Sequence, residues 1–96
     1  MLVLNSPSNP SGASYSKNEL MAIAKVLLAH PNITIVTDDI YEHIFWGSEK
    51  FVNIINVCPE LYDRTIVVNG VSKAYSMTGW RIGYAAGPDL IVKEMK

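Results

Sequence analysis

Three short apolar runs, each followed at once by polar residues, constrain the fold of this chain most strongly. The runs are Leu2–Leu4, Ile33–Thr37 and Thr65–Val68. The two later runs are rich in β-branched residues, which is typical of strands that are buried in a parallel sheet. A helical pattern separates the first run from the second. This alternation favours an α/β fold with a largely parallel sheet.

The segment between the first two runs has the signature of a helix. Ser16 and Glu19 form a capping box at its start, and the pair His30-Pro31 ends it. Apolar residues at helical spacing predict one buried face, made of Leu20, Ile23, Ala24, Leu27 and Leu28. We therefore expect a scaffold helix that covers the sheet. Residues 43–64 give weaker signals and are expected to be a connection with a short helix near Ile54.

The stretch Asn69–Tyr84 (NGVSKAYSMTGWRIGY) holds one lysine and one arginine. Lys73 follows the third apolar run, and Arg81 would open a further strand, Arg81–Ala86. If that strand is antiparallel to the one before it, the two cations face the same edge of the sheet. A deprotonated lysine amine can condense with an aldehyde, and the planar guanidinium binds a phosphate at two points. An isolated pair of this kind would be interpreted as solvated surface charges.

Polar residues follow each of the three apolar runs. They are Asn9 after the first, Asp38 and Tyr41 after the second, and Ser72 and Lys73 after the third. Ligands bind at the carboxyl edge of open parallel sheets, and three strands about 4.8 Å apart offer a row roughly 10 Å wide. We expect one site there. Each residue also has a structural interpretation, with Asp38 as a cap, Tyr41 as a packed aromatic and Asn9 as a turn former.

The composition is that of an ordinary soluble domain, with 96 residues, 49% hydrophobic residues and a formal net charge of −1. This length suffices for one small core, so residues 1–96 are expected to form a single, partial domain. No basic patch indicates nucleic acid, and no apolar run approaches a membrane span. The single cysteine, Cys58, cannot form an internal disulfide, and no metal-ligand spacing is visible. A cytoplasmic location is the expectation.

The stretch SKAYSMTGWRIGYAAGP resembles the lysine segment of class I, pyridoxal-phosphate-dependent aminotransferases of fold type I, and most of all that of the aspartate aminotransferases. In that family an arginine eight positions after the lysine holds the cofactor phosphate, and Arg81 stands eight positions after Lys73. NSPSNPSG at residues 5–12 resembles the family's asparagine-proline loop, and TDDIYEHIF at residues 37–45 resembles its aspartate segment.

The resemblance implies that the chain forms a contiguous part of the family's seven-stranded mixed sheet. This part would have about four strands, three parallel and one antiparallel, with flanking helices. Their order across the sheet would be RIGYAA, TIVV, ITIVT, LVL. Such a block would leave two sheet edges and an apolar face uncovered, which favours association with another copy.

The resemblance also implies roles for the three charged candidates. Lys73 would carry pyridoxal 5'-phosphate covalently and would move the α-proton of the substrate. Arg81 would hold the phosphate. Asp38 would pair with the pyridinium nitrogen and keep it protonated, so that the ring can take up electrons from a substrate carbanion.

Polar, uncharged residues would complete the site. Tyr41 and Asn9 would hydrogen-bond the phenolic oxygen of the cofactor, and Asn9 would also reach the substrate carboxylate. Ser72 would add a hydroxyl to the phosphate, although many relatives place a serine where this chain has Gly70. The peptide bond between Asn9 and Pro10 would be cis.

The activity implied by the resemblance is transfer of an amino group between an amino acid and a 2-oxo acid, with aspartate as the expected amino acid. The parent enzyme would be a homodimer. A lyase of the same fold would keep Lys73, Asp38, Tyr41 and Arg81, so this alternative stays open. The resemblance runs through essentially all 96 residues but covers only part of an aminotransferase. The isolated chain is therefore expected to be inactive, as a non-catalytic structural piece.

Several neighbouring residues receive no catalytic role. Tyr75, Trp80 and Tyr84 are interpreted as packing residues. Asp39, His43 and Cys58 are also interpreted as non-catalytic, since a lone histidine or thiol without a placed partner is weak evidence for a site.

Overall fold

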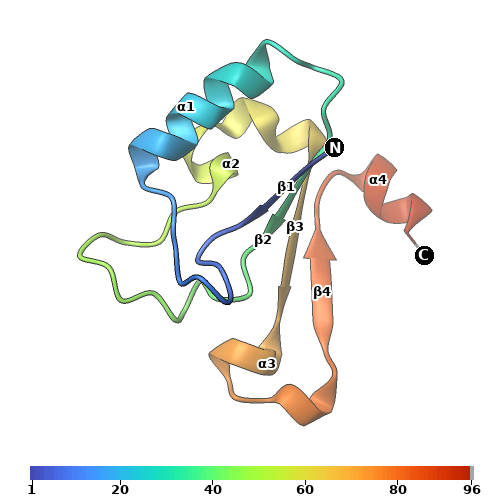
Figure 1. The fold of residues 1–96 in the computed structure, drawn as a ribbon. Helices are drawn as coiled ribbons and strands as arrows, with labels where there is room; N and C mark the ends of the chain where they lie inside the picture. The colour runs from blue at the N-terminus through green and yellow to red at the C-terminus, as the bar shows by residue number, and fades with distance from the viewer. Residues whose placement is uncertain (96) are drawn as a thin grey trace.

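The computed structural model describes residues 1–95 and confirms the α/β fold (Figure 1). Its sheet has four strands in the order β1-β2-β3-β4. The first three strands are parallel, and β4 runs antiparallel to β3. The expected strand order and directions are therefore confirmed. The strands are β1 (Leu2–Asn5), β2 (Ile35–Asp38), β3 (Thr65–Gly70) and β4 (Gly83–Ala86).

Helices connect and flank these strands. The long helix α1 and the short α2 lie on the same side of the sheet (Figure 1), and α3 follows directly on β3. No helix within residues 1–95 is both long enough and apolar enough to cross a bilayer. The helices are α1 (Lys17–Leu28), α2 (Ile54–Val57), α3 (Val71–Ala74) and α4 (Asp89–Glu94), with 3-10 turns η1 (Pro59–Arg64) and η2 (Thr78–Trp80).

Helix α1 forms as the capping box predicts. The backbone N–H of Glu19 donates to Ser16 Oγ (3.3 Å), and the N–H of Ser16 donates to Glu19 Oε2 (2.8 Å). Leu28 was expected on the buried face but is 48% exposed. At 100° per residue it points 80° away from Leu20, at the margin of the apolar stripe. The rest of the stripe packs on the sheet.

The hydrophobic core lies between α1, α2, η1 and one face of the sheet. It contains side chains from every one of these elements, so the helices and the sheet are held together by burial of apolar surface. Its members are Leu4, Leu20, Ala24, Leu27, Ile35, Ile54, Val57, Cys58 and Leu61.

The strand boundaries differ from expectation by one or two residues, and the differences in β3 and β4 bear on the site. Strand β3 continues through Asn69 and Gly70, because these residues pair with Tyr84 and Gly83 of β4. Strand β4 begins at Gly83 rather than at Arg81. The backbone of Arg81 is left-handed, with φ 55° and ψ 40°, and a residue in that conformation cannot continue a pleated strand.

The interpretation of three aromatic residues as packing residues is wrong within residues 1–95. Tyr75 is 67% exposed, Trp80 67% and Tyr84 54%. They lie on or directly after α3, η2 and β4. Strands β3 and β4 form a hairpin, and the end of it that carries α3 extends away from α1 and α2 (Figure 1). The helices of the core do not reach this hairpin, so its aromatic side chains remain uncovered.

Candidate active site

The three parallel strands deliver the candidate residues to one edge of the sheet. All three strands point toward the end of the molecule that carries α3 (Figure 1). Asn9 lies in the loop after β1, Tyr41 in the turn after β2, and Lys73 in α3 after β3. The expectation that these segments share an edge is thus confirmed. The peptide bond between Asn9 and Pro10 is cis, also as expected.

A cavity of about 260 Å³ at this edge brings together three of the candidates. Asp38, Ser72 and Arg81 all line it. Asp38 Oδ1 accepts the backbone N–H of Ile40 (3.2 Å), which fixes the carboxylate at the end of β2. Within residues 1–95 its other oxygen has no hydrogen-bond donor. An acid, a hydroxyl and a guanidinium therefore surround one cavity.

The remaining candidates form a second group around Tyr41. Lys73 Nζ lies 5.7 Å from the centre of the Tyr41 ring, and both side chains are half-buried. Tyr41 and Asn9 line a neighbouring cavity of about 550 Å³. The contact of Lys73 with Tyr41 joins α3 to the turn after β2.

Arg81 reaches the edge from the opposite chain direction. It follows η2 and precedes the antiparallel strand β4, so β3 and β4 bring Ser72 and Arg81 to the same cavity although they belong to different arms of the hairpin. Arg81 Nη1 donates to the carbonyl oxygen of Thr78 (3.2 Å). Its side chain is otherwise exposed.

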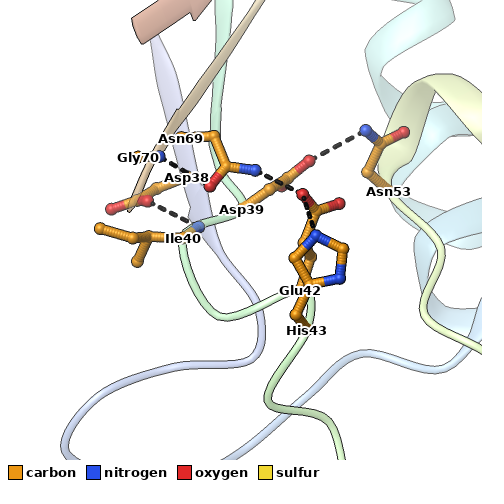
Figure 2. Close-up of polar contacts among 8 residues, drawn as sticks. All are labelled: Asp38, Asp39, Ile40, Glu42, His43, Asn53, Asn69 and Gly70. Atoms are coloured by element: carbon orange, nitrogen blue, oxygen red, sulfur yellow. Dashed lines mark hydrogen bonds and ion pairs between the residues drawn. The ribbon is translucent and has the colours of Figure 1, made fainter. Parts of the chain in front are cut away.

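A buried carboxylate, that of Asp39, follows directly on Asp38 in the chain (Figure 2). Asp39 is 2% exposed. Its Oδ1 accepts the hydroxyl of Thr37 (2.6 Å) and its Oδ2 accepts the amide of Asn53 (2.9 Å). Burial raises the pKa of the Asp39 carboxyl. Sequence reasoning gave Asp39 no partner, since Asn53 lies 14 residues further along the chain.

A second polar pair joins the turn after β2 to the end of β3 (Figure 2). Asn69 Nδ2 donates to Glu42 Oε1 (2.6 Å), and Asn69 Oδ1 accepts the N–H of Gly70 (2.7 Å). His43 Nε2 lies 3.4 Å from the same oxygen of Glu42. Sequence reasoning missed this pair because Asn-Gly is typical of a turn. The signal that could have found it is a buried-strand pattern with an amide at its end.

Comparison with known proteins shows what this arrangement is similar to. The chain is 59% identical over 96 residues to the aspartate/prephenate aminotransferase of Nitrosomonas europaea, and the match covers 100% of the chain. It is 57% identical over 93 residues to a probable aspartate/prephenate aminotransferase of Rhizobium leguminosarum bv. phaseoli. The chain spans only 24% and 23% of the length of these two relatives.

Solved structures agree with the sequences. The aspartate aminotransferase of Rhizobium meliloti superposes with a TM-score of 0.93 at 54% identity, over 97% of this chain and 23% of the other. The aromatic aminotransferase of Pyrococcus horikoshii superposes with a TM-score of 0.89 at 38% identity, over 97% and 24%. The four strands therefore form part of a fold-type I sheet.

The sequence profile of aminotransferase class I and II matches this chain over residues 1–96. The match includes every segment that reaches the cavity edge, from the loop after β1 to the hairpin of Lys73 and Arg81. The chain belongs to the aminotransferase class I and II family.

Proposed function

We propose that this chain is the central part of the cofactor-binding domain of a pyridoxal-phosphate-dependent aminotransferase. The single observation that carries the proposal is the cavity shared by Asp38, Ser72 and Arg81, with Lys73 next to Tyr41 at the same edge. Family membership supports the proposal. The activity belongs to the intact parent enzyme, because the chain spans 24% of its relatives' length.

The chemistry of these side chains fits pyridoxal phosphate. A guanidinium and a hydroxyl on one cavity suit a phosphate dianion. Asp38 keeps one carboxylate oxygen without a donor among the described residues, so it can accept a hydrogen bond from a protonated ring nitrogen. Tyr41 and Asn9 line one cavity and supply a phenol and a carboxamide for a phenolic oxygen. Lys73 supplies the amine that an aldehyde requires.

Each side chain then has a defined task in the proposed reaction. When bound, pyridoxal phosphate supplies an electron-accepting ring that stabilises the negative charge left after loss of the substrate's α-proton. Asp38 holds the proton on the ring nitrogen, and Arg81 binds the phosphate at two points. Lys73 would take the substrate's α-proton at Nζ and deliver it to the cofactor carbon that receives the amino group. Asn9 orients the substrate carboxylate.

We propose aspartate and a 2-oxo acid as the substrates. Support comes from the names of the relatives, which include aspartate and prephenate. A fold-type I lyase with the same cofactor residues is the alternative. The parent enzyme is further proposed to be a cytoplasmic homodimer, in which other parts of the enzyme cover the exposed aromatic residues of the hairpin.

One assay separates these possibilities. The intact gene product that contains residues 1–96 is mixed with aspartate and 2-oxoglutarate, and glutamate is measured. Glutamate formation that disappears in Lys73→Ala is the expected result. Consumption of aspartate without glutamate would support the lyase instead. Glutamate formation that survives in Lys73→Ala would contradict the proposal.

A further inference from the structure

We propose that Glu42 and Asn69 are positioning residues, which form a bridge between the two cofactor-facing segments at the edge of the sheet. The first segment, Asp38–Tyr41, carries the proposed ring partners. The second, Gly70–Lys73, carries the proposed phosphate hydroxyl and the amine. This inference rests on the proposed function for its chemical meaning, but the bridge itself is a feature of the fold.

The geometry of Asn69 leaves only one way to place its amide group. Glu42 Oε1, 2.6 Å from Nδ2, can only accept, and the N–H of Gly70, 2.7 Å from Oδ1, can only donate. The amide must therefore point its NH₂ group at Glu42 and its oxygen at Gly70. Asn69 is 7% exposed, so water does not compete freely for either bond.

The two ends of the bridge are directly attached to the site. Glu42 is the next residue after Tyr41, and its backbone N–H donates to the carbonyl oxygen of Asp39 (2.8 Å), which closes the turn after β2. Gly70 is the N-cap of α3 and has no side chain with which to cap it. The Asn69 side chain accepts the backbone N–H of Gly70 itself, and so fixes the position of the residue at which the helix with Lys73 begins.

The bridge joins the chain after β2 to the end of β3, beyond the last residues at which these two strands pair. The backbone N–H of Asp39 donates to the carbonyl oxygen of Val68 (2.9 Å), and the parallel pairing of β2 with β3 ends at Asp38 and Val68. Beyond that point the chain after β2 turns away, whereas β3 continues to Gly70 and pairs there with β4. The hydrogen bond from Asn69 to Glu42 extends the connection to the level of Tyr41, whose ring contacts Lys73. Because its acceptor is a carboxylate, it is one of the stronger kinds of hydrogen bond.

The test uses the intact gene product and two readouts. The first is hydrogen exchange at the Gly70 amide, followed by NMR, which needs no cofactor. Glu42→Ala and Asn69→Ala are each expected to speed exchange at Gly70 about tenfold, while amides in the middle of α1 stay unchanged. Glu42→Gln keeps an oxygen that accepts from Asn69 and is expected to exchange at nearly the parental rate.

The second readout is the affinity for pyridoxal phosphate, measured by titration of its absorbance. Loss of the bridge is expected to weaken binding of pyridoxal phosphate roughly tenfold in either alanine variant. The double variant is expected to bind no more weakly than the single variants, because each substitution removes the same contact. His43→Gln is the matched control. His43 contacts the same carboxylate oxygen, but Glu42 is its neighbour in the chain and within residues 1–95 the His43 side chain has no hydrogen bond to a second segment. This variant is therefore expected to match the parent in both readouts.

Unchanged exchange at Gly70 in Glu42→Ala would overturn the bridge, and so would effects of the two substitutions that multiply in the double variant. If Asn69→Ala does not fold, the comparison of Glu42→Ala with Glu42→Gln decides. If pyridoxal phosphate binds to none of the proteins, the proposed function fails, whereas the exchange experiment still decides whether the bridge exists.

Discussion

The Nζ atom of Lys73 lies 5.7 Å from the centre of the Tyr41 ring. This distance is within the range of a cation–π interaction, and it joins α3 to the turn after β2. The aromatic face stabilises the ammonium without a hydrogen bond that would have to be broken when the amine reacts. The contact involves the ring of Tyr41 and not its hydroxyl, so the two parts of the side chain can be tested separately.

Substitutions of Tyr41 test these properties. Tyr41→Phe keeps the ring and is expected to keep the contact with Lys73, whereas Tyr41→Leu loses it. A double-mutant cycle with Lys73→Met, measured by urea unfolding, is expected to give a coupling free energy of about 0.5 kcal/mol with Tyr and with Phe. A coupling that disappears in the phenylalanine series would show that the hydroxyl, and not the ring, holds Lys73.

Arg81 is expected to lower the stability of the fold through its backbone conformation and to bind the phosphate through its guanidinium. Its left-handed backbone (φ 55°) is unfavourable for a residue with a Cβ, and glycine removes that cost. Arg81→Gly should therefore raise the free energy of unfolding by about 0.5 to 1 kcal/mol and weaken binding of pyridoxal phosphate by the intact gene product.

The matched control is Ser76→Gly, because Ser76 has a φ of 54° but lines none of the cavities that contain the candidate residues. It should gain similar stability with unchanged cofactor binding. Equal losses of cofactor affinity in both glycine variants would mean that hairpin flexibility, and not the guanidinium, sets the affinity.

Asp39 should make stability depend on pH. Burial raises the pKa of this carboxyl above its ordinary value of 3.8, so the folded chain holds the proton at pH values where the unfolded chain has lost it. The free energy of unfolding therefore falls as pH rises from about 3.8 through the raised pKa. Asp39→Asn can bond both Thr37 and Asn53 without a charge, and should abolish this fall.

The measurement is urea unfolding of the parent and Asp39→Asn across a pH series. The difference between the two curves isolates Asp39 from groups such as Glu19 and Glu60, whose pKa values are lowered by hydrogen bonds. Asp39→Leu serves as the control for lost hydrogen bonds and should cost about 1 to 3 kcal/mol. Parallel pH curves for the parent and Asp39→Asn would contradict the assignment.

Arg64 should stabilise the end of α1. Its guanidinium donates to the carbonyl oxygens of Leu27 (2.6 Å), Ile33 (2.8 Å) and His30 (2.9 Å), so it ties the last turn of α1 to the connection that leads into β2. Arg64→Ala is expected to lower the free energy of unfolding by about 1.5 to 3 kcal/mol. Arg64→Lys should recover only part of this loss, since an ammonium lacks the planar fork. A lysine variant as stable as the parent would show that charge alone is sufficient.

The sheet and the first helix could be predicted from sequence because their signals are local. β-Branched runs and a capping box between Ser16 and Glu19 depend on residues close together in the chain. The strand order was available only through the resemblance to a family. What could not be predicted depends on contacts between distant segments, such as the burial of Asp39 against Asn53 or the bond from Asn69 to Glu42.

The start of β4 was missed for a different physical reason. Arginine is common in strands, and nothing in GWRIGY reveals that the chain turns through a left-handed residue at Arg81 before pairing begins. The exposed aromatic residues of the hairpin were misjudged because a sequence shows that Trp80 is hydrophobic, but not whether a partner for it lies within residues 1–95.

The gathering of Lys73, Asp38 and Arg81 around one cofactor is tested most directly by mapping a covalent label. The intact gene product is incubated with pyridoxal phosphate and reduced with borohydride, and the labelled peptide is identified by mass spectrometry. The expected result is one stoichiometric label on Lys73, lost in Lys73→Ala and weakened in Arg81→Ala. Label spread over Lys17, Lys25 and Lys50 with none on Lys73 would contradict the proposed site.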